Sequence, residues 1–153
     1  MNELEPFETK LAGLIGNLSP QSRKALAVTI AKRLRASQQQ NIQRQQAPDG
    51  TPYTPRKTQL RSKQGRIKRA MFTKLRTARY LKANGSSNAA VVEFVGRVKR
   101  MAEVHHYGLR DRPSVHSSYV RYEKRQLLGV HASDVKDIEQ IIIQSILGLN
   151  PDH

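Results

Sequence analysis

The sequence predicts a mixed α+β fold: an N-terminal pair of helices, a small antiparallel sheet, and a C-terminal helix packed on that sheet. Apolar residues recur every three or four positions near both ends of the chain, which is the pattern of amphipathic helices. Valine-rich runs in the middle favour strands instead. The length of 153 residues fits one domain, residues 1–153, and a hydrophobic fraction of 37% predicts a small core.

Two helices are predicted in the N-terminal region. The first has Pro6 in its first turn and ends at Gly16-Asn17. Ser19 and Pro20 have the residue types of an N-cap and a first helical position, so the second helix begins there. The apolar positions of the two helices are Leu4, Phe7, Leu11, Leu14, Ile15 and Leu18, and then Leu26, Ile30 and Leu34.

A glutamine-rich tract follows at residues 37–46, with Ile42 as its apolar residue. Because glutamine and arginine are good helix formers, we expect the second helix to continue toward Ala47 as an exposed extension. The tract is either a solvated helix end or a surface that orders against a neighbouring subunit.

Residues 48–70 have a different composition, with three prolines, two glycines and almost no apolar side chain. Asp49-Gly50 is a turn signal, and Pro52 and Pro55 exclude regular helix. The segment has too few apolar groups to form a core, so we expect a long, exposed basic arm that is disordered in the free subunit. A short apolar patch dominated by Met71, Phe72 and Leu75 is expected to dock its far end.

The remaining elements follow from local patterns. Strands are expected at 77–82 and 89–95, joined by a Gly/Asn/Ser-rich turn at 84–88, with a third strand at 117–123. A short helix begins near Arg97 and ends at Gly108. The last helix is capped by Ser133 and ended by Gly148 and Pro151. Its apolar face predicts core positions at Val135, Ile138, Ile141, Ile142, Ile146 and Leu149.

The net charge is +15, from 27 Lys and Arg against 12 Asp and Glu. The bases are concentrated in residues 10–125, which hold 26 of the 27 bases and five acids, whereas both ends are acidic. Residues 56–82 carry eleven bases and no acid. Such a chain predicts an acidic partner, and its acidic ends can also pair with the basic middle of another copy.

No catalytic pattern is evident. The sequence has no cysteine and no phosphate-binding glycine motif, and its carboxylates are scattered. We expect adjacent His105 and His106 to face different sides, one buried and hydrogen-bonded, the other exposed. We therefore expect no enzyme, no metal and no cofactor. The acidic N-terminus and the lack of an apolar run of about 18 residues predict a soluble intracellular protein without a membrane segment.

Several segments occur in a familiar order: LSPQSRKALAVTIAKRLRASQQQNI, PDGTPYTPRK, MFTKLR, AEVHHYG and RQLLG before the last helix. This set resembles the virion morphogenesis, or tail completion, proteins of contractile-tailed bacteriophages over about residues 10–149. Tyr53 stands where a tryptophan is expected, and this change keeps an aromatic plug.

The resemblance implies a structural protein at the head-proximal end of the tail, which completes or terminates the tail and enables head–tail joining. It implies localisation in the virion neck, after assembly in the host cytoplasm. It also implies a homo-oligomeric ring, a hexamer as the first expectation, that contacts tail tube, sheath or neck and connector proteins.

The basic segment at residues 56–82 suggests where such contacts form. Its arginines alternate with Gln, Ser and Thr, the composition of a hydrogen-bonded protein interface. We predict that most of these bases contact neighbouring proteins and that a minority face DNA in the lumen. The alternative is a non-specific nucleic-acid-binding protein that uses the same segment, and a small nuclease is a third candidate. The predicted interface residues are Arg56, Lys57, Arg61, Arg66 and Arg69.

Overall fold

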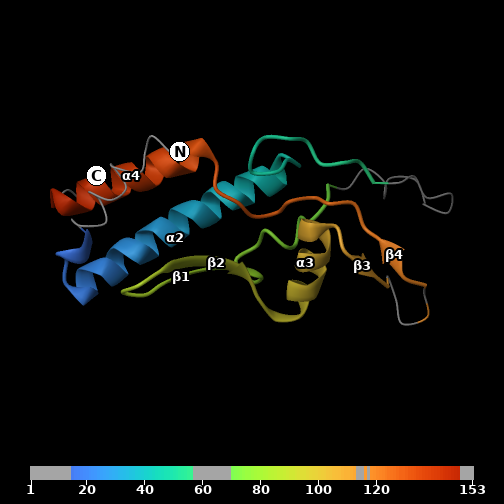
Figure 1. The fold of residues 1–153 in the computed structure, drawn as a ribbon, viewed down its shortest axis with the longest axis horizontal. Coiled ribbons are helices and arrows are strands. Elements are labelled where there is room, and N and C mark those ends of the chain that lie inside the picture. Colours follow the sequence, from blue (N-terminus) through green and yellow to red (C-terminus); the bar gives the residue numbers. More distant parts are fainter. Residues whose placement is uncertain (1–14, 57–69, 113–115, 117, 149–153) are drawn as a thin grey trace. The chain divides into compact units, whose positions relative to one another are not determined.

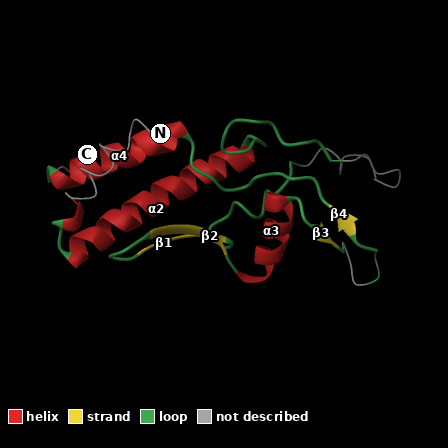
Figure 2. Ribbon diagram, viewed as in Figure 1, coloured by secondary structure: helices red, strands yellow, loops and turns green. Residues whose placement is uncertain are grey.

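The computed structural model describes residues 15–56, 70–112, 116 and 118–148. Its helices are α2 (Pro20–Gln43), α3 (Lys99–Tyr107) and α4 (Ala132–Ile146), with a 3₁₀ turn η1 at Gly96–Val98 (Figures 1 and 2). Its strands are β1 (Leu81–Gly85), β2 (Ala90–Phe94), β3 (Arg110–Asp111) and β4 (Val120–Arg121). The predicted α+β class is confirmed. Most of the first predicted helix lies outside the described residues.

Within the described residues, no helix has both the length and the apolar character that a membrane crossing requires. The chain divides into two compact units. Unit 1 comprises residues 1–35, 83–92 and 132–153, and unit 2 comprises residues 36–82 and 93–131. The unit boundaries fall inside α2, β1 and β2, so these elements contribute residues to both units.

Unit 1 has an aliphatic core between α2 and α4, which lie side by side (Figure 1). Leu26 of α2 and Ile142 of α4 are buried at its centre, which confirms the prediction that the C-terminal helix is part of the core. α4 also shares this unit with the turn of the β1–β2 hairpin. The partly buried residues around the centre are Ile15, Leu18, Ile30, Ile138, Ile141 and Ile146.

The start of α2 matches its prediction, and the start of α4 differs by a residue. The Ser19 hydroxyl accepts a hydrogen bond from the Ser22 backbone N–H at 3.1 Å, so Ser19 caps the helix that begins at Pro20. α4 begins at Ala132, which places Ser133 inside its first turn and makes the predicted Ser133 cap wrong. Asp134 in that turn is buried.

The hairpin approaches α2 at a glycine. A Cβ atom on Gly85 would lie 2.5 Å from the backbone nitrogen of Val28, so only glycine permits this contact. β1 begins at Leu81, and the predicted strand at residues 77–80 is wrong. Those residues form turns instead, because Leu81 N–H bonds the Thr77 carbonyl at 2.9 Å and the Thr77 hydroxyl bonds the Lys74 carbonyl at 2.7 Å.

Unit 2 consists largely of turns and short elements. α2 ends at Gln43 and does not reach Ala47. The chain reverses after the helix, with Ala47 N–H donating to the Thr51 carbonyl at 2.8 Å, and the predicted Asp49-Gly50 turn is confirmed by a Gly50 φ of 90°. α3 ends at Gly108 in the left-handed conformation, as predicted.

The third strand differs from its prediction. Only Val120–Arg121 of the predicted 117–123 strand forms β4. β4 pairs with β3 in its own two-stranded sheet and not with the β1–β2 hairpin. The alternating pattern therefore predicted strand structure correctly but not its extent or its partner.

Candidate partner interface

Of the predicted interface residues, the structure describes Arg56, whose side chain is exposed. Lys57, Arg61, Arg66 and Arg69 lie outside the described residues. The structure therefore does not test whether these five residues come together. It shows how unit 2 fixes the chain immediately before the basic segment.

Arg125 binds the backbone that leads to Arg56. Its Nε donates to the Thr54 carbonyl at 2.8 Å and its Nη2 to the Pro55 carbonyl at 3.3 Å. The side chain is buried, and this burial lowers the pKa of Arg125. A guanidinium holds two successive carbonyls in a fixed geometry, so the start of the basic segment is anchored. Sequence analysis missed this role, although Arg125 opens the RQLLG segment.

A row of aromatic rings lies beside this anchor. Tyr53 is buried, with its ring edge-on to Phe72 at 5.7 Å between centroids. His105 follows at 4.9 Å from Phe72 and 5.0 Å from Tyr122. Burial raises the pKa of Tyr53 to about 12. The predicted aromatic plug is confirmed.

The burial of Tyr53 also corrects one prediction. Segment 48–70 does contribute to a core, because Pro48 and Tyr53 are both buried. The apolar patch around Met71 and Leu75 is confirmed, since both side chains are buried. Sequence analysis underestimated the segment because it weighed the average composition and not single large residues.

The glutamine-rich tract is more than a solvated helix end, whereas its ordering against a neighbouring subunit stays a prediction. Gln38 is buried and forms two bonds with Gly129, donating to its carbonyl at 2.8 Å and accepting from its N–H at 3.0 Å. Gln45 forms the same pair of bonds with Met71, both at 2.8 Å. Gln39 donates to the Arg76 carbonyl at 2.7 Å. The glutamine side chains thus supply the hydrogen-bond donors and acceptors that a neighbouring strand would otherwise offer to the loop backbone.

Both histidines of the pair are half-buried, so the expectation of one buried and one exposed ring is wrong. The Nδ1 of His106 accepts bonds from the N–H groups of Leu127 at 3.2 Å and Leu128 at 3.4 Å. Burial lowers the pKa of both rings. The lowered pKa favours the neutral form of His106, whose Nδ1 can accept the hydrogen bonds from residues 127 and 128.

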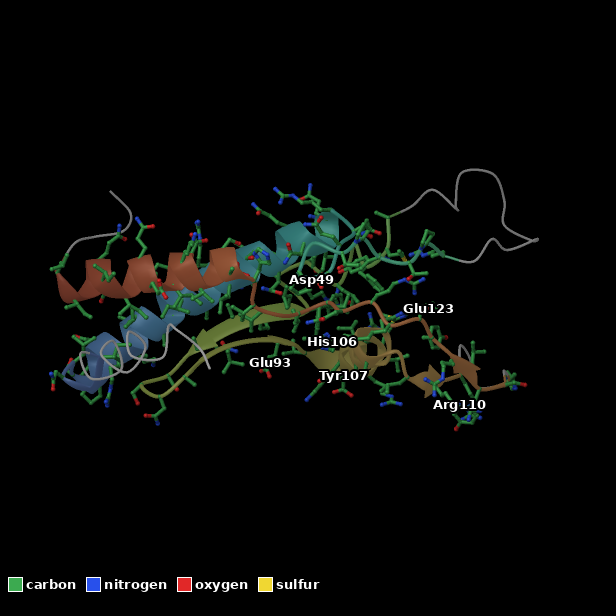
Figure 3. All side chains as sticks on the ribbon, turned by 45° about the horizontal axis from the view of Figure 1, so that its top comes forward. Asp49, Glu93, His106, Tyr107, Arg110 and Glu123 are labelled. Atoms are coloured by element: carbon green, nitrogen blue, oxygen red, sulfur yellow. The ribbon has the colours of Figure 1, made fainter. Side chains whose placement is uncertain are left out.

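A second surface of unit 2 is rich in arginine and tyrosine. Tyr107 at the end of α3 and Tyr119 beside β4 are 63% and 59% exposed. Figure 3 labels His106 and Tyr107 on α3 and Arg110 on β3. Among the residues that the structure describes, no group of three or more His, Cys, Asp or Glu side chains has the arrangement of a metal site. The polar side chains described above bind the chain's own backbone and so position its loops.

The chain matches the phage virion morphogenesis family over residues 2–147, and it belongs to that family. It is 46% identical over 145 residues to tail completion protein S of Escherichia phage P2. This alignment covers 94% of the chain and 97% of the relative. No solved structure is significantly similar to the chain.

Proposed function

We propose that the chain is a non-enzymatic virion assembly protein that completes the phage tail at its head-proximal end and enables head–tail joining. The similarity to tail completion protein S carries this proposal, because it extends over nearly the whole of both chains. The structure supports it through unit 2, where glutamine, arginine and histidine side chains are used to position loops.

The anchor at Arg125 gives the basic segment a role in this function. The buried guanidinium and the Tyr53 plug fix the chain up to Arg56, immediately before the other predicted interface bases. Arg56, Lys57, Arg61, Arg66 and Arg69 then contact neighbouring virion proteins such as tail tube, sheath or connector. Copies of the chain form a ring around the tail axis, with a hexamer as the first expectation, and few of these bases face DNA.

The second candidate is non-specific nucleic-acid binding through the same segment. The eleven bases without an acid at 56–82 favour it. Within the described part, the Arg79 guanidinium lies 5.3 Å from the centre of the Tyr80 ring. Arginine and tyrosine together also bind nucleic acid, so an experiment must separate the two functions.

The test is complementation of a phage whose own copy of the gene is disabled. Pairs of bases are replaced, as in R56Q/K57Q and R66Q/R69Q, and particles are examined by electron microscopy. We expect normal heads and tails that fail to join. The control K24Q/K32Q removes two exposed lysines from α2 and should assemble normally.

Two results would contradict the proposed role. Complete particles that only fail to deliver DNA would assign the bases to a DNA conduit. A purified monomer that co-elutes with RNA until nuclease is added, with normal joining by every variant, would favour the nucleic-acid-binding candidate.

A further inference from the structure

The small β3–β4 sheet places two arginines directly opposite each other. Arg110 pairs with Arg121 and Asp111 with Val120 in antiparallel register. Tyr122 N–H donates to the Leu109 carbonyl at 3.0 Å, so the neighbouring pair 109/122 is hydrogen-bonded. Hydrogen-bonded and non-hydrogen-bonded pairs alternate in such a ladder, so Arg110 and Arg121 occupy a non-hydrogen-bonded pair. Side chains come closest at such pairs, with Cα atoms about 4.5 Å apart.

The face that carries this pair is strongly basic. Two residues away from the pair, Arg112 lies over the Tyr119 ring at 5.2 Å. Glu123 is the nearest carboxylate in sequence on this face, whereas Asp111 points to the other face and takes Arg100 at 3.7 Å. Within the described residues, no ion pair involves Arg110 or Arg121. Like charges directly opposite each other destabilise an isolated sheet, so an anionic partner would stabilise this face.

The edge of β4 offers further contacts. β4 pairs only with β3 among the described residues. At a non-hydrogen-bonded position the backbone N–H and C=O point away from the partner strand, so those of Arg121 face the open edge. Val120 is 44% exposed on the opposite face. The edge therefore presents main-chain groups, an arginine face and an apolar face to an added strand.

We propose that residues 2–5 of a second copy of this chain add to the β4 edge as an extended strand, so that Leu4 joins this strand in place of the position predicted for it on the first helix. In Asn2-Glu3-Leu4-Glu5, alternation puts Glu3 and Glu5 on one face and Leu4 on the other. With Leu4 opposite Val120, both glutamates face the arginine side in either strand direction. Pro6 lacks an N–H and ends the added strand.

Charge complementarity selects this occupant. The first nine residues carry three glutamates and no base. Two of the three acids of α4 are less available, because Asp137 pairs with Arg33 at 3.3 Å and Asp134 is buried, and Glu139 is a single carboxylate. A DNA backbone would satisfy the arginines but would leave Val120 and the strand edge without partners.

This contact is head to tail, because it joins two different surfaces of the same chain. Such contacts close into rings when the rotation between copies permits it. The inference thus rests on the proposed assembly function and names one subunit contact within it.

The absence of cysteine from the sequence allows a direct test. L4C and V120C are made as separate proteins, mixed and oxidised, and the products are separated on a non-reducing gel. We expect disulfide-linked dimers from this mixture. V91C is the matched control, an exposed valine of β2 that is 40% accessible. Equal yields with V120C and V91C, or no dimer with V120C, would overturn the inference.

A charge exchange tests the arginine face. R110E/R121E should weaken self-association in light scattering by about tenfold or more, because it brings like charges together. E3R/E5R should also weaken self-association. The variant that combines R110E/R121E with E3R/E5R should associate again, because the charges across the contact are opposite once more. K82E/K99E reverses two other exposed bases of unit 2 and should associate normally. A combined variant that stays monomeric while K82E/K99E associates would contradict the contact.

The outcomes for the contact and for the function are distinguishable. If the wild-type chain completes tails while L4C and V120C form no cross-link, the contact is rejected and the proposed function stands. If cross-linking and charge exchange confirm the contact, but variants in which it is broken still yield infectious particles, the contact has no part in tail completion.

Discussion

Both units bury apolar side chains, but they differ in how far buried polar side chains contribute. Unit 1 buries aliphatic side chains between α2 and α4, with Leu26 and Ile142 at the centre. Unit 2 also has an apolar core, in which Ile42, Leu81 and Leu127 are fully buried. It adds polar side chains that bind loop backbone, among them Gln38, Arg125 and His106. Helices satisfy their own backbone groups and need only apolar contact, whereas loops need partners for every buried N–H and C=O. A loop-rich unit therefore places polar residues inside.

The largest effect is expected in unit 1. Ile142→Ala removes a buried side chain from the aliphatic core and should lower the free energy of unfolding by about 2–5 kcal/mol. Thermal or denaturant unfolding measures it. The control Ile143→Ala changes the next residue, which is 41% exposed, and should cost far less. Equal losses for both variants would mean that burial does not explain the stability of unit 1.

The next effect tests the anchor of unit 2. Arg125→Ala removes the bond to the Thr54 carbonyl at 2.8 Å and the longer, weaker bond to the Pro55 carbonyl at 3.3 Å. A hydrogen bond of a charged group contributes about 1.5–3 kcal/mol. Unfolding should become easier by an amount in that range. Limited trypsin digestion should also cut faster after Arg56. Lys124→Ala is the control, and unchanged cleavage in Arg125→Ala would show that the anchor does not hold this segment.

A smaller loss is expected at the glutamine tract. Gln38→Ala leaves the N–H and carbonyl of Gly129 without their partners, at a cost of about 1–3 kcal/mol. Gln40 lies two residues away on the exposed side of α2, so Gln40→Ala should leave stability almost unchanged. Urea unfolding of the two variants gives the comparison. A tract that served only as a solvated helix end would show no difference.

The smallest effect is a pH dependence confined to unit 2. Burial, with a contribution from Lys124, lowers the pKa of His106 below its ordinary value of 6.5. Below about pH 6.5 the unfolded chain binds a proton more readily than the folded ring does. The free energy of unfolding is therefore highest above this pH and falls as the pH drops. His106→Asn keeps an acceptor without titrating and should reduce this slope. Gln40→Ala, an exposed change that removes no titrating group, should leave the slope unchanged.

The sequence predicted the features that depend on neighbouring residues. Ser19-Pro20 starts a helix and Gly108 ends one, because both signals act within a single turn. The Ile142 core position followed from helical periodicity. The same logic failed at residues 77–80, where local turn bonds outweighed a weak strand pattern.

The roles of the polar residues depend on distant partners. Gln38 binds a residue 91 positions away and Arg125 one 71 positions away, and no local pattern specifies such pairs. Pro52 and Pro55 correctly excluded regular helix, whereas the burial of the tyrosine between them was indicated by the family resemblance and not by composition. The sequence likewise did not predict that Arg110 and Arg121 lie opposite each other, because this depends on the register of β3 and β4.

The division of the chain has a consequence for protein synthesis. Unit 1 takes residues from three separate stretches, and the last of these contains α4. Ile142 is synthesised long after Leu26, so the Leu26 side chain has no completed core until α4 has left the ribosome. A nonsense codon anywhere before residue 132 thus removes the α4 side of this core. Neither unit is a single uninterrupted stretch that a shorter gene fragment encodes.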